Sequence, residues 1–146
     1  MSSHVINTGR VFVSKPWGYE DWIVNTELYC GKLLFIKKNM HLSLHFHRLK
    51  TETFYQNSGE VIIEYYDDPS LDQYFTSWDK YQEIWNDPHS PIKHQLESVH
   101  LTPGDSFQIP VGRRHTVKAL LDSQVFEFST QHFDDDSIRV LQGMSC

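Results

Sequence analysis

Short segments rich in β-branched and aromatic residues recur along most of the chain. They occupy residues 10–14, 19–24, 32–38, 42–47, 52–56, 60–66, 98–102, 106–110, 115–121 and 125–133. Turn-forming sequences such as QNSGE, TPGD and PVGR separate many of them. Segments of this length and composition are typical of β-strands. Because few helical patterns intervene, the sequence predicts an all-β barrel or sandwich rather than an alternating βαβ sheet.

The segment at 67–97 departs from this pattern. Apolar side chains recur there at helical spacing, and they are Leu71, Phe75, Trp78, Tyr81 or Gln82, and Trp85. Asp68 is a suitable N-cap and Pro69 a suitable first helical residue. We therefore predict one short amphipathic helix over 69–85, inserted into the β fold. Its aromatic stripe either packs on the barrel or a subunit partner, or forms a lid over a ligand site.

The composition indicates one globular domain over residues 1–146. Hydrophobic residues make up 39% and aromatic residues 14% of the 146 positions, enough for one substantial core. The net charge of −6 argues against nucleic acid or an anionic membrane as the main partner, since both require clustered Lys and Arg. Cys30 and Cys146 have no metal-binding or redox spacing, so we expect two unpaired thiols.

The N-terminal sequence also bears on location. It lacks a charged region followed by an apolar region, and no apolar run approaches the length that spans a bilayer. We expect a cytoplasmic protein.

Three histidines occur within seven residues in the stretch HLSLHFH. Successive side chains of a strand alternate between its two faces, so His45 and His47 point the same way. Glu52 lies an odd number of residues beyond both and would face away on one continuous strand. The sequence RLKT can form a turn, however, and Glu52 would then face inward from the returning strand.

A second block, PGDSFQIPVGRRHTV, contains Pro110 and Gly112 at positions that suit a tight turn before a strand. This turn would deliver His115 to the other three residues. The predicted metal ligands are therefore His45, His47, Glu52 and His115. Three imidazoles and one carboxylate suit one divalent transition metal, which is Mn, Fe, Co, Ni or Zn, with positions left open for water or substrate.

Two motifs carry a resemblance to a known superfamily. The first is His45-x-His47-x4-Glu52-x6-Gly59, and the second begins at Gly104 and ends at His115 through Pro110 and Gly112. Together they resemble the paired motifs of the cupin superfamily. This resemblance implies a double-stranded β-helix, or jelly-roll barrel.

A narrower resemblance covers most of the chain. The segments KPWGYE, LSLHFHRLKTETFYQNSGEV, IPVGRRHTV and FEFSTQHFDDDSIRV are similar in order to the type II phosphomannose isomerase domain. This resemblance implies an isomerase or epimerase that acts on a sugar or a sugar phosphate. His45 stands where that family has glutamine, and Lys15 stands where it has arginine.

The resemblance also suggests roles for individual residues. Isomerisation needs a base that moves a proton between adjacent carbons, and Glu52 and His132 are the candidates. The candidate substrate-binding cations are Lys15, Lys32, Arg114 and Arg139, and Trp17 could stack on a sugar ring.

Two other functions remain open at this point. Three His and one Glu on a jelly roll also suit an iron-dependent oxygenase, and the third alternative is a non-catalytic metal- or carbohydrate-binding module. Long edge strands and the aromatic helix would be awkward on a free monomer, so we expect a homodimer.

Overall fold

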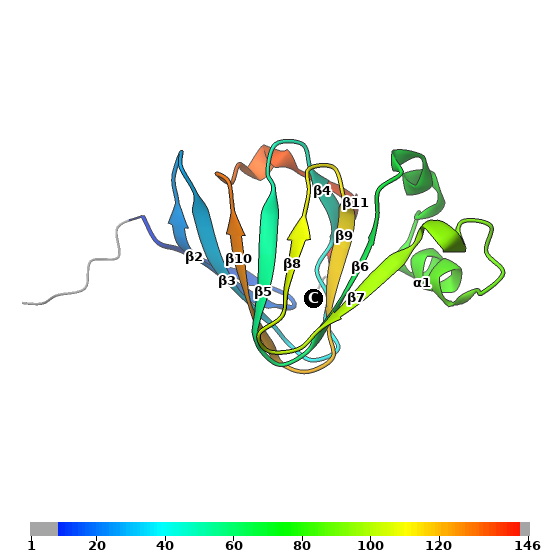
Figure 1. Ribbon diagram of the computed structural model, residues 1–146, viewed down its shortest axis with the longest axis horizontal. Coiled ribbons are helices and arrows are strands. Elements are labelled where there is room, and N and C mark those ends of the chain that lie inside the picture. Colours follow the sequence, from blue (N-terminus) through cyan, green and yellow to red (C-terminus); the bar gives the residue numbers. More distant parts are fainter. Residues whose placement is uncertain (1–8, 144–146) are drawn as a thin grey trace, which may run out of the picture.

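The computed structural model describes residues 9–143, which form two facing antiparallel β-sheets (Figure 1). The first sheet has the order β1-β2-β3-β10-β5-β8 and consists of β1 (Val11–Lys15), β2 (Gly18–Asn25), β3 (Cys30–Ile36), β10 (Ser123–Ser129), β5 (Glu52–Ser58) and β8 (Ser106–Ile109). The second has the order β11-β4-β9-β6-β7 and consists of β11 (Ser137–Leu141), β4 (Leu44–His47), β9 (Arg114–Ala119), β6 (Val61–Tyr66) and β7 (Glu97–Leu101). The all-β jelly roll predicted from the sequence is confirmed.

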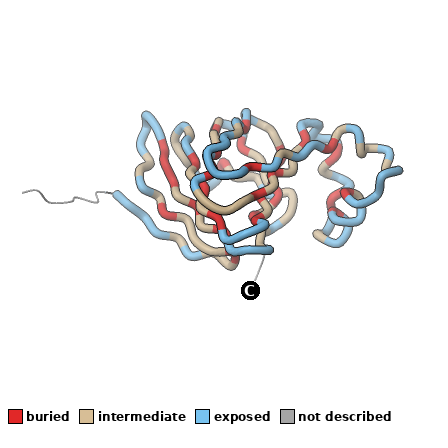
Figure 2. Tube along the Cα trace, turned by 60° about the horizontal axis from the view of Figure 1, so that its bottom comes forward, coloured by how far each residue is buried: buried red, intermediate tan, exposed pale blue. Residues whose placement is uncertain are grey.

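The main core lies between the two sheets and follows the alternation of the strands. Along β5 the buried residues are Glu52, Phe54 and Gln56, which confirms that this strand returns with Glu52 facing inward. The apolar residues that meet them include Leu34, Ile36, Val61, Ile63, Val117 and Val125. Figure 2 shows buried positions along the strands of both sheets. Full burial of one such side chain contributes about 1.5–3 kcal/mol.

The turn after β5 closes one end of the barrel. Gly59 has a φ of 77°, and a Cβ atom there would lie 2.3 Å from the carbonyl oxygen of Asp122. Only glycine satisfies both the left-handed backbone and this close approach.

The insertion between β6 and β7 lies beside the edge of the five-stranded sheet that these two strands form (Figure 1). It contains a 3-10 helix at Pro69–Tyr74, helix α1 (Trp78–Asn86) and a 3-10 turn at Lys93–Gln95. The continuous helix predicted over 69–85 is thus divided. The physical reason is Ser77, whose side chain caps α1 by accepting a hydrogen bond from the backbone N–H of Lys80.

The apolar face of the insertion packs in a second cluster on the five-stranded sheet. Leu71, Phe75, Tyr81 and Trp85 pack there with Leu44 and Tyr66 of the sheet. No residue of 67–97 lines the large cavity described below. The arrangement therefore matches the packing alternative rather than the lid. None of the described helices is long and apolar enough to cross a membrane.

Arg114 joins the insertion to β9. Its Nη2 atom lies 3.0 Å from Oδ2 of Asp72, and its Nε lies 3.1 Å from Oδ1. The guanidinium carbon also stacks 3.6 Å from the ring centre of Phe46. The hydroxyl of Tyr66 donates to the same Asp72 carboxylate at 2.7 Å. The Asp72 carboxylate of the insertion thus accepts hydrogen bonds from two side chains of the barrel.

The sequence analysis did not identify strand β11. It is short and follows three consecutive aspartates, which obscure its pattern. It pairs with β4 and places Ser137 opposite His47 and Arg139 opposite His45. The predicted segment 125–133 ends its strand at Ser129 and continues as an irregular connection. Cys30 is a buried free thiol, and Cys146 lies outside the described residues.

We expect Asp72→Ala to lower the free energy of unfolding by about 3 kcal/mol, because it leaves the buried Arg114 cation without its carboxylate. Urea denaturation measures this change. Glu83→Ala is the matched control in α1, where an exposed carboxylate pairs with Lys80 at 3.5 Å. It should cost less than about 1 kcal/mol. Equal effects of the two variants would contradict the anchoring role.

Candidate metal centre

Four side chains from three strands converge inside the barrel. His45 and His47 come from β4, Glu52 begins β5, and His115 lies on β9. Backbone pairing places His45 directly opposite His115. One nitrogen or oxygen atom from each of the four residues lies within 4.8 Å of all the others. The structure therefore brings together all four predicted ligands.

Backbone carbonyls select the tautomer of the three imidazoles. Each Nδ1 atom faces a carbonyl oxygen, at 3.1 Å from Ser43 for His45, 3.3 Å from Asp136 for His47 and 2.9 Å from Arg113 for His115. A carbonyl only accepts, so each Nδ1 carries the proton and each Nε2 presents a lone pair. This is the tautomer that binds metal through Nε2.

The buried donor atoms at the centre lack partners. Nε2 of His47, Nε2 of His115 and both carboxylate oxygens of Glu52 form no hydrogen bond. Oε1 of Glu52 nevertheless lies 3.0 Å from Nε2 of His115 and 3.5 Å from Nε2 of His47. Lone pairs so close repel each other unless a cation lies between them. The four residues therefore fit one divalent transition metal.

The ionisation of these groups agrees with that assignment. Burial alone would raise the pKa of Glu52, but the charge of Lys50 favours its carboxylate, and the pKa lies well below its usual value. Burial, together with the neighbouring His115 and His47, lowers the pKa of His45 well below its usual value. The site thus offers a carboxylate and a neutral imidazole, which are the forms that bind metal.

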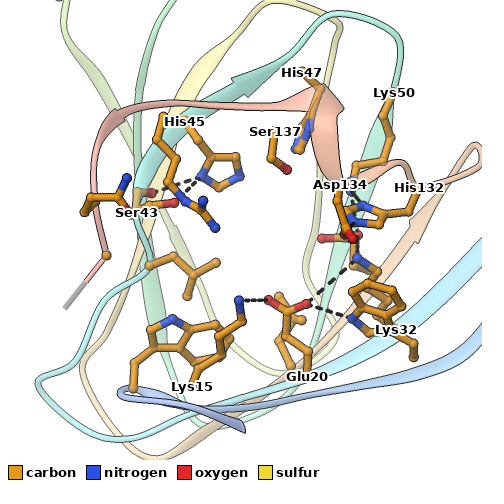
Figure 3. A pocket seen from close by; sticks show the side chains of 18 of the residues that line it. Lys15, Glu20, Lys32, Ser43, His45, His47, Lys50, His132, Asp134 and Ser137 are labelled. Carbon is orange, nitrogen blue, oxygen red and sulfur yellow. Dashed lines mark hydrogen bonds and ion pairs between the residues drawn. The ribbon is translucent and has the colours of Figure 1, made fainter. Parts of the chain in front are cut away.

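A cavity of about 770 Å³ opens beside the site. His45 and His47 line it, together with five of the predicted catalytic and substrate-binding residues: Lys15, Trp17, Lys32, His132 and Arg139. Figure 3 shows Lys15 and Lys32 on one side of this space and the two histidines on the other. Trp22, Leu34 and Phe54 add an apolar wall. A volume of this size accommodates a small organic molecule.

Sequence reasoning missed an ionic network on the cavity wall. Nζ of Lys50 lies 3.1 Å from Oε2 of Glu127 and 3.4 Å from Oε2 of Glu52. Lys32 lies 4.0 Å from Glu127 and 3.9 Å from Glu20. Glu127 could have been identified from the sequence, because it shares the inward face of its strand with Val125, and a charge on that face is unusual.

Two predicted residues have other environments. Arg114 does not line the cavity, because it faces the opposite side of β9 from His115 and binds Asp72. His132 lines the cavity, but both of its ring nitrogens have partners. Nε2 lies 3.0 Å from a carboxylate oxygen of Asp134, and Nδ1 lies 3.4 Å from Nζ of Lys50.

The fold and the site define a metal-binding cupin. The family model of D-lyxose isomerase matches residues 10–140, so the chain belongs to the D-lyxose isomerase family, a family of sugar isomerases. The match includes all four candidate ligands and the insertion. A comparison with curated protein sequences finds no significant match. The phosphomannose isomerase resemblance is therefore supported only at the level of the cupin superfamily.

Solved structures support the same fold. KdgF from Halomonas sp. is 18% identical, with a TM-score of 0.61, and the match covers 91% of this chain and 98% of that one. The capsular polysaccharide assembling protein CapF from Staphylococcus aureus is 16% identical, with a TM-score of 0.64 and coverage of 89% and 34%. Oxalate decarboxylase from Bacillus subtilis is 14% identical, with a TM-score of 0.63 and coverage of 91% and 30%. The chain thus spans about a third of CapF and of oxalate decarboxylase.

We expect Glu52→Gln to weaken metal binding by more than about 100-fold, because it removes the anionic ligand while keeping the shape of the side chain. Elemental analysis after dialysis against Mn²⁺ or Zn²⁺ measures occupancy. Glu97→Gln, on the exposed face of β7, should leave occupancy unchanged. Full occupancy in Glu52→Gln would remove Glu52 from the ligand set.

The partly buried position of His132 predicts a pH dependence of stability. Burial, followed by the charges of Lys32 and Lys50, lowers its pKa from 6.5 to about 4. Between these values the unfolded chain binds a proton that the folded chain does not, so stability falls as the pH drops from 6.5 to 4. Allowing for solvent screening, His132 accounts for about 2 kcal/mol of this loss.

The measurement is urea denaturation of the chelator-treated protein across this pH range. His132→Gln should flatten the pH dependence relative to the wild type. Parallel curves for the two proteins would contradict the expected burial effect.

Proposed function

We propose that the protein is a metal-dependent aldose–ketose isomerase that converts D-lyxose to D-xylulose. Family membership supports the reaction class. The observation that carries the proposal is the position of an open His/Glu metal site on the wall of a cavity, next to a buried Lys50–Glu127 pair. An oxygenase or a binding module has no evident need for that buried acid–base pair.

The reaction moves the carbonyl group from C1 to C2. One proton leaves C2 and one is added to C1, while a hydroxyl proton moves from O2 to O1, so no external reactant is consumed. A divalent ion held by His45, His47, Glu52 and His115 would polarise the carbonyl and stabilise negative charge on the two oxygens. The chain must then supply the group that transfers the proton between carbons.

Glu127 is the best-placed base. Burial, followed by the charge of Glu52, raises the pKa of Glu127, whereas Lys50 and Lys32 oppose that rise. A carboxylate with a raised pKa both removes and returns a proton more readily at neutral pH. In this proposal Glu127 takes the proton from C2 and delivers it to C1, and the Lys50 ammonium holds the carboxylate in place.

Glu52 and His132 receive other roles in this proposal. Glu52 stays a metal ligand, because its pKa is well below the usual value and it holds a proton poorly. His132 positions Lys50. Its Nε2–H donates to Asp134 at 3.0 Å, which leaves Nδ1 to accept from Lys50 at 3.4 Å.

The charge balance of the cavity favours a neutral sugar over a sugar phosphate. Lys15 and Lys32 both lie 3.9 Å from the Glu20 carboxylate, and Lys50 faces Glu127 and Glu52. Among the cavity's cations in the described part of the chain, only Arg139 forms no ion pair. Trp17 and Trp22 offer apolar surfaces for the C–H face of a sugar.

The homodimer expected from the sequence is retained as a proposal. Leu33, Phe126 and Tyr55 are neighbours in register across β3, β10 and β5 of the six-stranded sheet, and Phe12 of β1 lies in the same row beyond Asp21 of β2. They lie on the face opposite the core, and Phe12 is 62% exposed. These apolar side chains on an outer sheet face favour contact with a second copy. The cytoplasmic location likewise stays a prediction.

We expect the metal-loaded protein to exchange deuterium from heavy water into the sugar at C1 or C2 and to form the ketose. Glu127→Gln should lower kcat by about 10²–10⁴-fold, because an amide cannot accept the carbon-bound proton. It should leave metal occupancy unchanged. NMR of D-lyxose, with D-mannose and ribose 5-phosphate as comparison substrates, measures both exchange and specificity.

Three results would change the proposal. Wild-type rates in Glu127→Gln would show that another residue is the base. Faster turnover of the phosphorylated sugar would overturn the neutral substrate. Absence of exchange with every metal and sugar would favour a binding module or an iron-dependent oxygenase.

A further inference from the structure

We propose that Asp136 is a positioning residue that folds the loop between His47 and Glu52 and so sets the geometry of two metal ligands. The inference rests on the proposed metal site and assigns the site's assembly to one side chain. Asp136 lies in the 3-10 turn Asp134–Asp136, directly before β11. It is only 5% exposed, unlike the two aspartates before it.

The Asp136 carboxylate binds three successive backbone donors of the loop. Oδ1 accepts from the N–H groups of Arg48 and Leu49, both at 2.9 Å, and Oδ2 accepts from the N–H of Lys50 at 3.0 Å. Charge-assisted hydrogen bonds of this kind are about twice as strong as neutral ones. Together they hold the chain as it turns from β4 to β5.

Core packing gives this loop little other support. The side chains of Arg48 and Leu49 are exposed, and Leu49 exposes 69% of its surface. The loop nevertheless joins a ligand at the end of β4 to a ligand at the start of β5. It also carries Lys50, whose ammonium must reach both Glu52 and Glu127. The hydrogen bonds to Asp136 are therefore the main restraint on Arg48 and Leu49.

Asp136 also touches a metal ligand directly through its backbone. Its carbonyl oxygen accepts from Nδ1 of His47 at 3.3 Å, which selects the tautomer with a free Nε2. Pairing of β11 with β4 places Ser137 opposite His47 and keeps this carbonyl in position. One residue thus orients His47 with its main chain and shapes the path to Glu52 with its side chain.

The test compares Asp136→Asn with Asp135→Asn, which alters the exposed neighbouring aspartate. In Asp136→Asn one oxygen of the fork becomes an NH₂ group, which opposes a backbone N–H instead of accepting from it. The probe is Co²⁺ alone, added to chelator-treated protein. Calorimetry gives its Kd, and visible absorption reports its coordination geometry. The melting temperature of the metal-free protein measures the purely structural effect.

We expect Asp136→Asn to weaken Co²⁺ binding by about 10–100-fold and to change the visible spectrum, as is usual when groups that orient metal ligands are altered. Asp135→Asn should match the wild type. If Asp136→Asn does not fold, Asp136→Ser, which keeps one acceptor, replaces it with the same expectation.

Wild-type affinity and spectrum in the Asp136 variants, with only a lower melting temperature, would overturn the inference and leave the metal site standing. Failure of the wild type itself to bind Co²⁺ would instead overturn the metal site, and this inference with it.

Discussion

The repulsion among four clustered donor groups is the constraint on which the rest of this structure depends. The lone pairs of His47 and His115 and the carboxylate of Glu52 are buried in the barrel without a hydrogen bond, and the partly buried His45 meets them beside the cavity. Lys50 compensates only the outer oxygen of Glu52, so the inner oxygen and the imidazole lone pairs are desolvated at a cost. Backbone carbonyls prevent the imidazoles from relieving this repulsion through the other tautomer. A cation bound at this site would relieve the repulsion, and metal binding would then be linked to stability.

The same constraint explains the second layer of charges around the site. The Lys50 ammonium forms ion pairs with the outer oxygen of Glu52 and with Glu127. Glu127 also forms an ion pair with Lys32. Charge alternates outward from the metal centre into the cavity. A substrate that enters this space meets oriented donors and acceptors in place of bulk water, which strengthens each interaction with it. In the proposed mechanism, binding and proton transfer therefore share one network.

The alternation of side chains along strands made the metal ligands predictable from sequence. His45 and His47 share a face by parity, and a turn after His47 brings Glu52 back to it. The same rule would have excluded Arg114, since it directly precedes the inward-facing His115. Glu127 and Asp136 were harder to assign because their partners lie 77 and 86–88 residues away. Strand alternation marks Glu127 as an inward-facing charge, but the partners of both residues depend on β10 and β11 reaching the site, and such long-range pairing leaves no local pattern.

The two faces of β9 give the insertion an importance that its surface position does not suggest. His115 points inward to the metal centre, and the adjacent Arg114 points outward to Asp72. A segment that resembles a tolerant surface loop is thus bound to the residue next to a ligand. Deleting 67–97 to obtain a minimal barrel would remove the counterion of Arg114, the residue directly before the candidate ligand His115. Residues 67–97 therefore contribute to the support of the barrel strand that carries His115, and a shortened variant should retain them.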